Sequence, residues 1–424
     1  MDIVIEPAGQ LSGEIELPPS KLHTQIACAL AMLCEGKSTI KSPLRVKDTN
    51  VMLKAAEILG ATVKRTQERW AIWGVGKTPK PAQNVIDAKN SGTALSLLVS
   101  IATLSPTPIV INGDAQLRSR PMPALIRVLR CLGADIHSTK PDDSPPFVIF
   151  GGGLGGGKVR LSEAETRCIP AVFLSAPCAK KKVECSIPAD PKFQLEPALE
   201  LMKIARAKMT ERKKKISIVN HPYRPFNYSV RREVARAAPF IAAAGLTGSE
   251  LKLRDGKDIS SRDGTFLRTL KSFGLRVNFS KKSINVAGGR GLRAARLDLS
   301  WAPELLPLMA VIACGAKGRT AIRNAEEARY MKSDRISATA RELRRMRAKV
   351  LEQKDGLIIQ GPAKLRGCEV DSHDDYAVTA ALAVAGLVAE GKTVIKNGAD
   401  ALGTSYSRFL STFQSIGGGV NYHS

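Results

Sequence analysis

The chain has 424 residues, of which 44% are hydrophobic, so it is long enough to form two domains with buried cores. A net charge of +25 with only 5% aromatic residues favours small phosphorylated ligands, and it makes nucleic acid the less favoured partner because base-stacking strips are missing. No run approaches the roughly 18–20 uncharged apolar residues of a membrane span, and no basic-then-apolar leader opens the chain, so we expect a cytoplasmic protein with no membrane partner.

An apolar helix, a turn and a β-rich run recur six times, with the turns near residues 36, 105, 180, 248, 317 and 391. This spacing is a period of about 70 residues. An amphipathic helix and alternating strands follow each apolar helix. Because the apolar helices are hydrophobic nearly all round, we expect them to be buried on most faces. The pattern predicts an α/β fold of two lobes, each with three βαβ-type repeats, helices inside and sheets outside.

Two segments mark where the chain would cross between the lobes. Residues 1–17 are predicted to form a pair of strands before the first apolar helix, and residues 219–233, rich in proline and aromatics, separate the third repeat from the fourth. We predict a first lobe of residues 14–226, and a second lobe of residues 1–13 and 227–424. The cleft between the lobes is the expected ligand site.

Residues 90–93, Asn-Ser-Gly-Thr, precede the apolar helix of the second repeat. Backbone N–H groups at a helix start, together with the positive end of the helix dipole, form an anion-binding arrangement. We therefore predict that Asn90, Gly92 and Thr93 help to hold an anion. Ser96 stands in the next turn, where an arginine would strengthen such a site.

Eight cysteines fall mostly within apolar runs, without a Cys-x-x-Cys pair or a Cys/His cluster. This distribution favours small buried thiols in a reducing compartment. A metal or redox site is the less favoured interpretation, and we expect no metal.

Ten short motifs carry a resemblance to a known family in the family's own order. They include "PPSK" at 18–21, "NSGTAL" at 90–95, "GDAQLRSRPMPAL" at 113–125, "ARYMKSDRISATARELRRM" at 328–346 and "DSHDDYAV" at 371–378. In these motifs the chain resembles the enolpyruvyl transferase family, and within it the 5-enolpyruvylshikimate-3-phosphate synthases, over almost its whole length. The resemblance implies a two-lobed fold that can be described as an inside-out α/β barrel.

The activity that the resemblance implies is the transfer of the enolpyruvyl group of phosphoenolpyruvate to the 5-hydroxyl of shikimate 3-phosphate, with release of phosphate. This transferase reaction belongs to the shikimate pathway of aromatic amino acid biosynthesis and uses no metal. We expect no cofactor and a monomeric protein. Both substrates are anionic, so the site needs several Lys and Arg residues and groups that move protons.

The resemblance also implies which residues do this. Glu304, where the family has an aspartate, is implied as the general base, against the alternative of an acid stabilised at a helix start. Lys21 is implied as a second catalytic residue that contacts both substrates, against the alternative of a solvent lysine. The implied substrate-binding residues are Ser20, Lys21, Asn90, Gly92, Thr93, Arg120, Thr166, Arg167 and Arg335.

The chain departs from the family at positions that hold Arg or Lys there, where it has Ile26, Ser96, Met331, Ala377 and Thr404. Each lost charge-assisted contact is typically worth about 1.5–3 kcal/mol. Three hypotheses therefore stay open. The first is a working synthase with other cations in the site, such as Arg167, Arg231, Arg232, Arg236 or Lys332. The second is a divergent paralogue with an altered substrate or lost catalysis, and the third is a polyanion-binding protein.

Overall fold

The computed structural model describes residues 1–188, 192–256, 259–280, 283–288, 291–403, 406 and 408–423. Its internal contacts divide the chain into two compact units, which we call unit 1 (residues 1–18 and 232–424) and unit 2 (residues 19–231). We describe each unit by itself.

The unit boundaries lie a few residues beyond the predicted lobe boundaries at 13/14 and 226/227. Strand pairing accounts for both differences. Strand β2 (Ser12–Glu16) pairs in parallel with β15 (Glu250–Arg254) in unit 1, so the first crossing follows β2. Strand β14 (Asn227–Ser229) pairs in parallel with β3 (Glu35–Lys41) in unit 2, so the second crossing follows β14.

Among the described residues, each unit has three four-stranded sheets, and all six sheets share one pairing pattern. A parallel pair at one edge is followed by two antiparallel pairs. In the sheet β6-β7-β9-β8, Val85 of β6 (Val85–Asp87) lies opposite Val110 of β7 (Ile109–Asn112) in parallel. Strand β9 (Phe147–Ile149) is antiparallel to both β7 and β8 (Ile136–Ser138). The shared pattern confirms the predicted α/β repeats.

The other strands belong to the remaining sheets. In unit 2 they are β4 (Thr62–Arg65), β5 (Arg69–Val75), β10 (Gly157–Arg160), β11 (Val183–Ser186), β12 (Met209–Arg212) and β13 (Lys215–Ile218). In unit 1 they are β1 (Asp2–Ile5), β16 (Arg276–Phe279), β17 (Ser283–Ala287), β18 (Arg296–Asp298), β19 (Gly318–Arg323), β20 (Lys349–Gln353), β21 (Gly356–Gly361), β22 (Glu369–Asp371), β23 (Thr393–Lys396) and β24 (Val420–His423).

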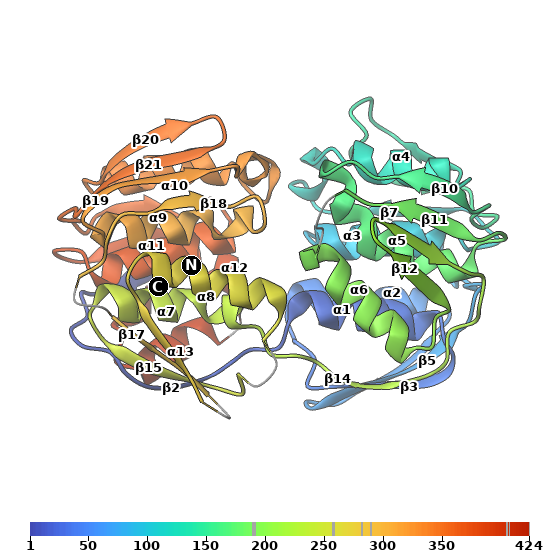
Figure 1. Ribbon diagram of the computed structural model, residues 1–424, viewed down its shortest axis with the longest axis horizontal. Coiled ribbons are helices and arrows are strands. Elements are labelled where there is room, and N and C mark those ends of the chain that lie inside the picture. The colour runs from blue at the N-terminus through green and yellow to red at the C-terminus, as the bar shows by residue number, and fades with distance from the viewer. Residues whose placement is uncertain are drawn as a thin grey trace. The chain divides into compact units, whose positions relative to one another are not determined.

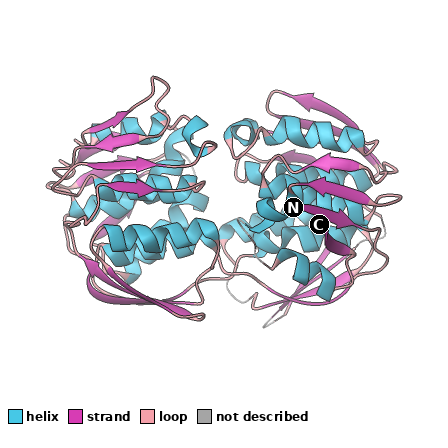
Figure 2. Cartoon of the chain, turned by 180° about the vertical axis from the view of Figure 1, so that it is seen from behind, coloured by secondary structure: helices cyan, strands magenta, loops and turns pink. Residues whose placement is uncertain are grey.

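The predicted apolar helices form the core of each unit, and the strands lie outside them (Figure 2). They are α1 (Lys21–Met32), α3 (Gly92–Ala102) and α5 (Ile169–Ser175) in unit 2, and α7 (Ala238–Leu246), α9 (Leu306–Gly315) and α11 (Tyr376–Leu387) in unit 1 (Figure 1). Every residue of α11 from Val378 to Leu387 is buried, as expected of a helix that is apolar all round.

The second helix of each repeat is amphipathic. These helices are α2 (Lys47–Ile58), α4 (Pro123–Cys131), α6 (Lys192–Ile204), α8 (Ser261–Ser272), α10 (Arg335–Arg345) and α13 (Phe409–Ser415). In α10, Ile336 and Leu343 are buried whereas Arg341 and Arg344 are exposed. These arginines therefore lie on the solvated face of the helix. Among the described residues, no helix combines the length and the apolarity that a membrane span requires.

The predicted pairing of the two N-terminal strands is wrong. Strands β1 and β2 both form, but they belong to different sheets. Strand β1 lies between β23 and β24, with Ile3 opposite both Ile395 and Tyr422. Strand β2 lies beside β15. Alternating residues predict a strand, but they do not say which partner it takes.

Gly361 lets strand β21 approach the C-terminal carbonyls of the buried helix α9. A Cβ atom there would lie 2.3 Å from the carbonyl oxygen of Ala316 and 2.5 Å from that of Ala313. We expect Gly361→Ala to lower the free energy of unfolding by about 1–3 kcal/mol, because backbone must shift to make room. Urea unfolding measures this. Gly9→Ala, where nothing lies within 4 Å, is the control, and equal urea midpoints for the two variants would contradict the prediction.

Candidate active site

Ser20 and Lys21 lie at the start of α1 in unit 2. Ser20 caps the helix, since its Oγ accepts the backbone N–H of His23 at 3.4 Å. The Nζ atom of Lys21 donates to Oδ2 of the buried Asp48 at 2.9 Å, while 28% of the lysine side chain stays exposed. The ion pair therefore fixes the ammonium group at the helix start and leaves part of it open to solvent.

The start of α3 brings together several of the predicted residues. Its N-cap is Ser91, whose Oγ accepts the backbone N–H of Ala94 at 3.3 Å. The Oδ1 atom of Asn90 accepts an N–H of Arg120 at 2.5 Å, and a Cβ on Gly92 would lie 3.8 Å from the same guanidinium. Asn90, Gly92 and Arg120 thus form one cluster with a cation at a helix N-terminus.

The residues that stand in place of the expected cations are buried or form hydrogen bonds with residues near them in sequence. Ile26 is fully buried in the core of unit 2. The Ser96 hydroxyl donates to the Gly92 carbonyl one turn earlier in α3, at 3.0 Å. Ala377 donates its backbone N–H to Oδ1 of Asp375 at 2.8 Å. Thr404 lies outside the described residues.

The glutamate beside the expected phosphate-binding residues is neutralised by a partner that the sequence did not indicate. Glu165 is buried and forms an ion pair with Arg127. It also accepts the backbone N–H and the hydroxyl of Ser162, both at 2.8 Å. Burial alone would raise the pKa of Glu165, but the hydrogen bonds from Arg127 and Ser162 outweigh it and lower the pKa.

The two neighbours of Glu165 that the sequence singled out have different surroundings. Thr166 lies in a short 3-10 helix (Ala164–Cys168), and its hydroxyl donates to the carbonyl oxygen of the N-cap residue Glu163 at 2.7 Å. Arg167 is exposed.

Glu304 lies in unit 1, in a short 3-10 helix (Pro303–Leu305) that leads into α9. Its carboxylate forms an ion pair with Arg262, a residue in the first turn of α8, and 34% of the Glu304 side chain is exposed. Arg262 also lies 3.6 Å from Oε1 of Glu233. One guanidinium therefore serves two carboxylates, one of which is the predicted base.

Asp263, next to Arg262, is a buried carboxylate that contacts a short 3-10 helix (Val234–Ala237) from an earlier part of unit 1. Its Oδ1 accepts the backbone N–H of Ala235 at 2.9 Å, and its Oδ2 is buried without a hydrogen-bond partner. Burial, and then the negative charge of Glu233, raise the pKa of Asp263 to about 6. A neutral side chain of the same shape would suit this position better above that pH.

We expect Asp263→Asn to stabilise the protein at about pH 8 by at most about 3 kcal/mol, from the distance between the ordinary pKa of 3.8 and the folded value of about 6. The folded pKa is raised, so this group favours folding below its ordinary pKa, and that contribution is lost as the pH rises through about 6. The advantage should vanish near pH 3. Denaturant unfolding at both pH values measures it, with the exposed Asp135→Asn as control. A variant less stable than wild type at about pH 8 would contradict this account.

Arg335 is the first residue of α10 in unit 1, and Asp375 holds its guanidinium. Its Nε donates to Oδ2 at 2.7 Å and one terminal nitrogen donates to Oδ1 at 2.9 Å, with both side chains buried. The other terminal nitrogen lies 2.9 Å from Sδ of Met331. Burial would raise the pKa of Asp375, but the Arg335 charge and hydrogen bonds lower it. Asp375 also caps α11, so the pair fixes two helix starts at once.

Two of the cations suggested as replacements are already paired with carboxylates. Arg231 lies 3.1 Å from Glu200 and 3.7 Å from Glu196 in unit 2. Arg232 lies 2.7 Å from Glu16 in unit 1.

Arg262 was not among the predicted residues. The available signal was its position, because a cation in the first turn of a helix opposes the helix dipole.

No group of at least three His, Cys, Asp or Glu residues in the described ranges is arranged to hold a metal ion. All eight cysteines are free; Cys131 is exposed, Cys178 and Cys368 are partly buried, and the others are buried.

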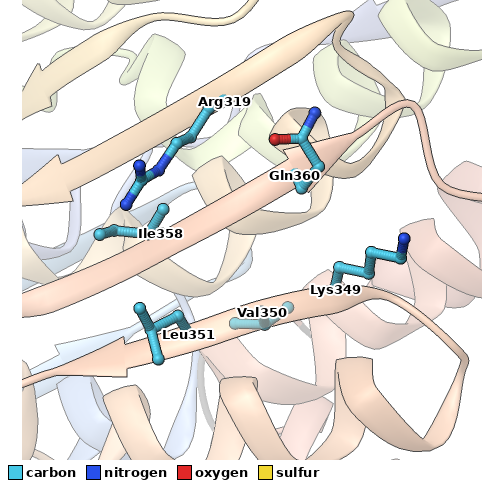
Figure 3. A pocket seen from close by; sticks show the side chains of 6 residues that line it. All are labelled: Arg319, Lys349, Val350, Leu351, Ile358 and Gln360. Carbon is cyan, nitrogen blue, oxygen red and sulfur yellow. The ribbon is translucent and has the colours of Figure 1, made fainter.

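A hollow of about 310 Å³ lies on the sheet of β19, β20 and β21 in unit 1 (Figure 3). Its lining residues are Arg319, Lys349, Val350, Leu351, Ile358 and Gln360, and none of them is a predicted site residue.

Comparison with known proteins identifies the family. A model of EPSP synthase (3-phosphoshikimate 1-carboxyvinyltransferase) matches residues 5–413. The chain belongs to the EPSP synthase family. Relatives named 3-phosphoshikimate 1-carboxyvinyltransferase include one from Methanococcus aeolicus, 33% identical over 99% of both chains. Another, from Methanosarcina acetivorans, is 34% identical over 96% of both chains.

Solved structures of the family share the fold. An EPSP synthase structure from Acinetobacter baumannii superposes with a TM-score of 0.83 at 24% identity, covering all of both chains. A second structure from the same organism has a TM-score of 0.82 at 23% identity. This likeness confirms the predicted two-lobed enolpyruvyl transferase fold.

Proposed function

We propose that the protein transfers the enolpyruvyl group of phosphoenolpyruvate to the 5-hydroxyl of shikimate 3-phosphate and releases phosphate. The observation that carries this proposal is the family match over residues 5–413, supported by relatives of that name that cover 96–99% of the chain. The protein would then be a transferase of the shikimate pathway. We propose that it acts in the cytoplasm as a monomer without a cofactor.

The reaction requires a base and several anion-binding groups. The oxygen of the acceptor hydroxyl bonds to C2 of phosphoenolpyruvate while its proton passes to a base, and C3 takes up a proton. Loss of that proton from C3 and of phosphate from C2 then restores the carbon–carbon double bond. We assign the base to Glu304, because its carboxylate is partly exposed at the start of a helix.

We assign anion binding to groups of both units. In unit 2 these are the exposed part of Lys21, the cluster of Asn90, Gly92 and Arg120, and the first turn of α3 with Thr93. Ser20, Thr166 and Arg167 complete the proposed set in that unit. In unit 1, a ligand of Arg335 would compete with Met331 for one terminal nitrogen, since Asp375 holds the other two guanidinium nitrogens.

A phosphate-release assay with purified protein, phosphoenolpyruvate and shikimate 3-phosphate tests the proposal. We expect release that needs both substrates, and a rise of Tm with either one. No release together with no rise of Tm would refute it. A rise of Tm with phosphoenolpyruvate alone, and no release with this acceptor, would instead favour a relative with a different acceptor.

A further inference from the structure

Helix stability does not explain why an arginine is found at position 262. It is in the first turn of α8, a helix of 12 residues whose N-cap is Ser260. The positive end of the helix dipole disfavours a cation there. Its guanidinium reaches outward to Glu304 and Glu233 instead of toward the C-terminal end of its own helix.

The ion pair is open enough to exchange partners. The side chains of Arg262, Glu304 and Glu233 are 26%, 34% and 16% exposed. Ion pairs that stay in contact with water contribute little to stability, so the guanidinium can leave one carboxylate for another anion at small cost. Glu233 would still neutralise part of its charge during such an exchange.

We propose that Arg262 binds phosphoenolpyruvate and holds Glu304 only until that substrate arrives. This inference rests on the proposed function. A carboxylate paired with a guanidinium accepts a proton less readily than a free one. When the guanidinium turns to the carboxylate or phosphate of phosphoenolpyruvate, it forms two parallel hydrogen bonds with that group. Glu304 is then free to accept the proton of the acceptor hydroxyl.

Several other cations that the family resemblance implied are replaced or already paired, which agrees with this role. The chain has Ile26, Ser96 and Met331 where its family resemblance implied cations. Two of the three guanidinium nitrogens of Arg335 already donate to Asp375. Arg231 and Arg232 are paired with carboxylates of the chain. Arg262 is paired too, but one of its two partners is the proposed base itself. Substrate binding and release of the base would therefore be one event.

The test compares Arg262→Gln with Arg268→Gln, which removes an exposed arginine from the same helix. We expect Arg262→Gln to raise the KM for phosphoenolpyruvate by about tenfold to hundredfold, from the loss of a charge-assisted pair of hydrogen bonds. The KM for shikimate 3-phosphate should stay within about twofold, because only one substrate loses its cation. Arg262→Lys keeps the charge but loses the planar guanidinium group. Its KM for phosphoenolpyruvate should therefore lie between those of wild type and Arg262→Gln.

Several outcomes would overturn the inference. The first is an unchanged KM for phosphoenolpyruvate in Arg262→Gln, and the second is a rise of KM that is confined to shikimate 3-phosphate. The third is an equal rise of the KM for phosphoenolpyruvate in Arg268→Gln, which would indicate an effect of net charge. Circular dichroism checks folding, and if Arg262→Gln does not fold, the KM of Arg262→Lys decides alone.

A second measurement separates this inference from the proposed function. It is the rise of Tm that phosphoenolpyruvate alone produces. If wild type releases no phosphate but Arg262→Gln abolishes this rise, the proposed function fails, while the binding of phosphoenolpyruvate by Arg262 stands. If wild type turns over and Arg262→Gln behaves like it, only the inference fails. If phosphoenolpyruvate stabilises neither protein and wild type releases no phosphate, both fail.

Discussion

Replacing Glu304 with Gln is expected to lower kcat by about a hundredfold to ten-thousandfold, the usual loss when a positioned base is removed. Gln keeps the shape of the side chain but cannot accept the proton of the acceptor hydroxyl. The change also releases Arg262 from its ion pair with Glu304. The KM for phosphoenolpyruvate should therefore fall in the same variant, because the cation no longer has to leave a carboxylate.

Steady-state phosphate release at varied phosphoenolpyruvate measures both effects. Glu250→Gln removes an exposed carboxylate from β15 in the same unit and serves as the control, with kinetics close to those of wild type. A Glu304→Gln variant with wild-type kcat would rule out Glu304 as the base. A lower kcat with a higher KM for phosphoenolpyruvate would keep the base but contradict the exchange of Arg262.

Replacing Asp375 with Asn is expected to lower the free energy of unfolding by about 3–5 kcal/mol, because it leaves Arg335 as a buried cation without its counter-ion. The side chains of Arg335 and Asp375 are only 8% and 0% exposed, so water cannot take the place of the carboxylate. Asp375 is also the N-cap of α11, a role that Asn can keep, so the expected loss comes from the ion pair. Urea unfolding at neutral pH measures the loss.

Asp374→Asn is the matched control, since Asp374 is the exposed neighbour in the same turn. The pH dependence gives a second check. The folded pKa of Asp375 is lowered, so its stabilisation is present above the ordinary value of 3.8 and is lost as the pH falls through the folded value. Wild type and Asp375→Asn should therefore converge in stability in acid. A constant difference down to strongly acidic pH would contradict the ion-pair explanation.

The repeats could be predicted from the sequence because their signal is local. Helices such as α11 are apolar on every face, and the turns that follow them recur at a regular period. Strand partners could not be predicted in this way. The pairing of Ile3 with Ile395 joins opposite ends of the chain, and nothing near either residue specifies the other.

The candidate site shows the same division. The cap of α11 by Asp375 is a contact between neighbours in sequence, of the kind that an acid before an apolar helix indicates. Glu165 lies beside the predicted residues Thr166 and Arg167, but its partner Arg127 lies 38 positions away, so the sequence does not indicate this ion pair. Arg262 was missed for the same reason, since only the folded chain brings it to Glu304.

The position of β1 has a consequence for biosynthesis. Unit 2 is one continuous segment, so it can fold as soon as residues 19–231 have left the ribosome. Strand β1 is made long before its neighbours β23 and β24. Strand β1 must therefore wait with both edges unpaired while the residues between it and β23 are made, exposed to other chains. The acid Asp2 is its first residue and Glu6 follows its last, and such charges discourage pairing with the wrong strand during that wait.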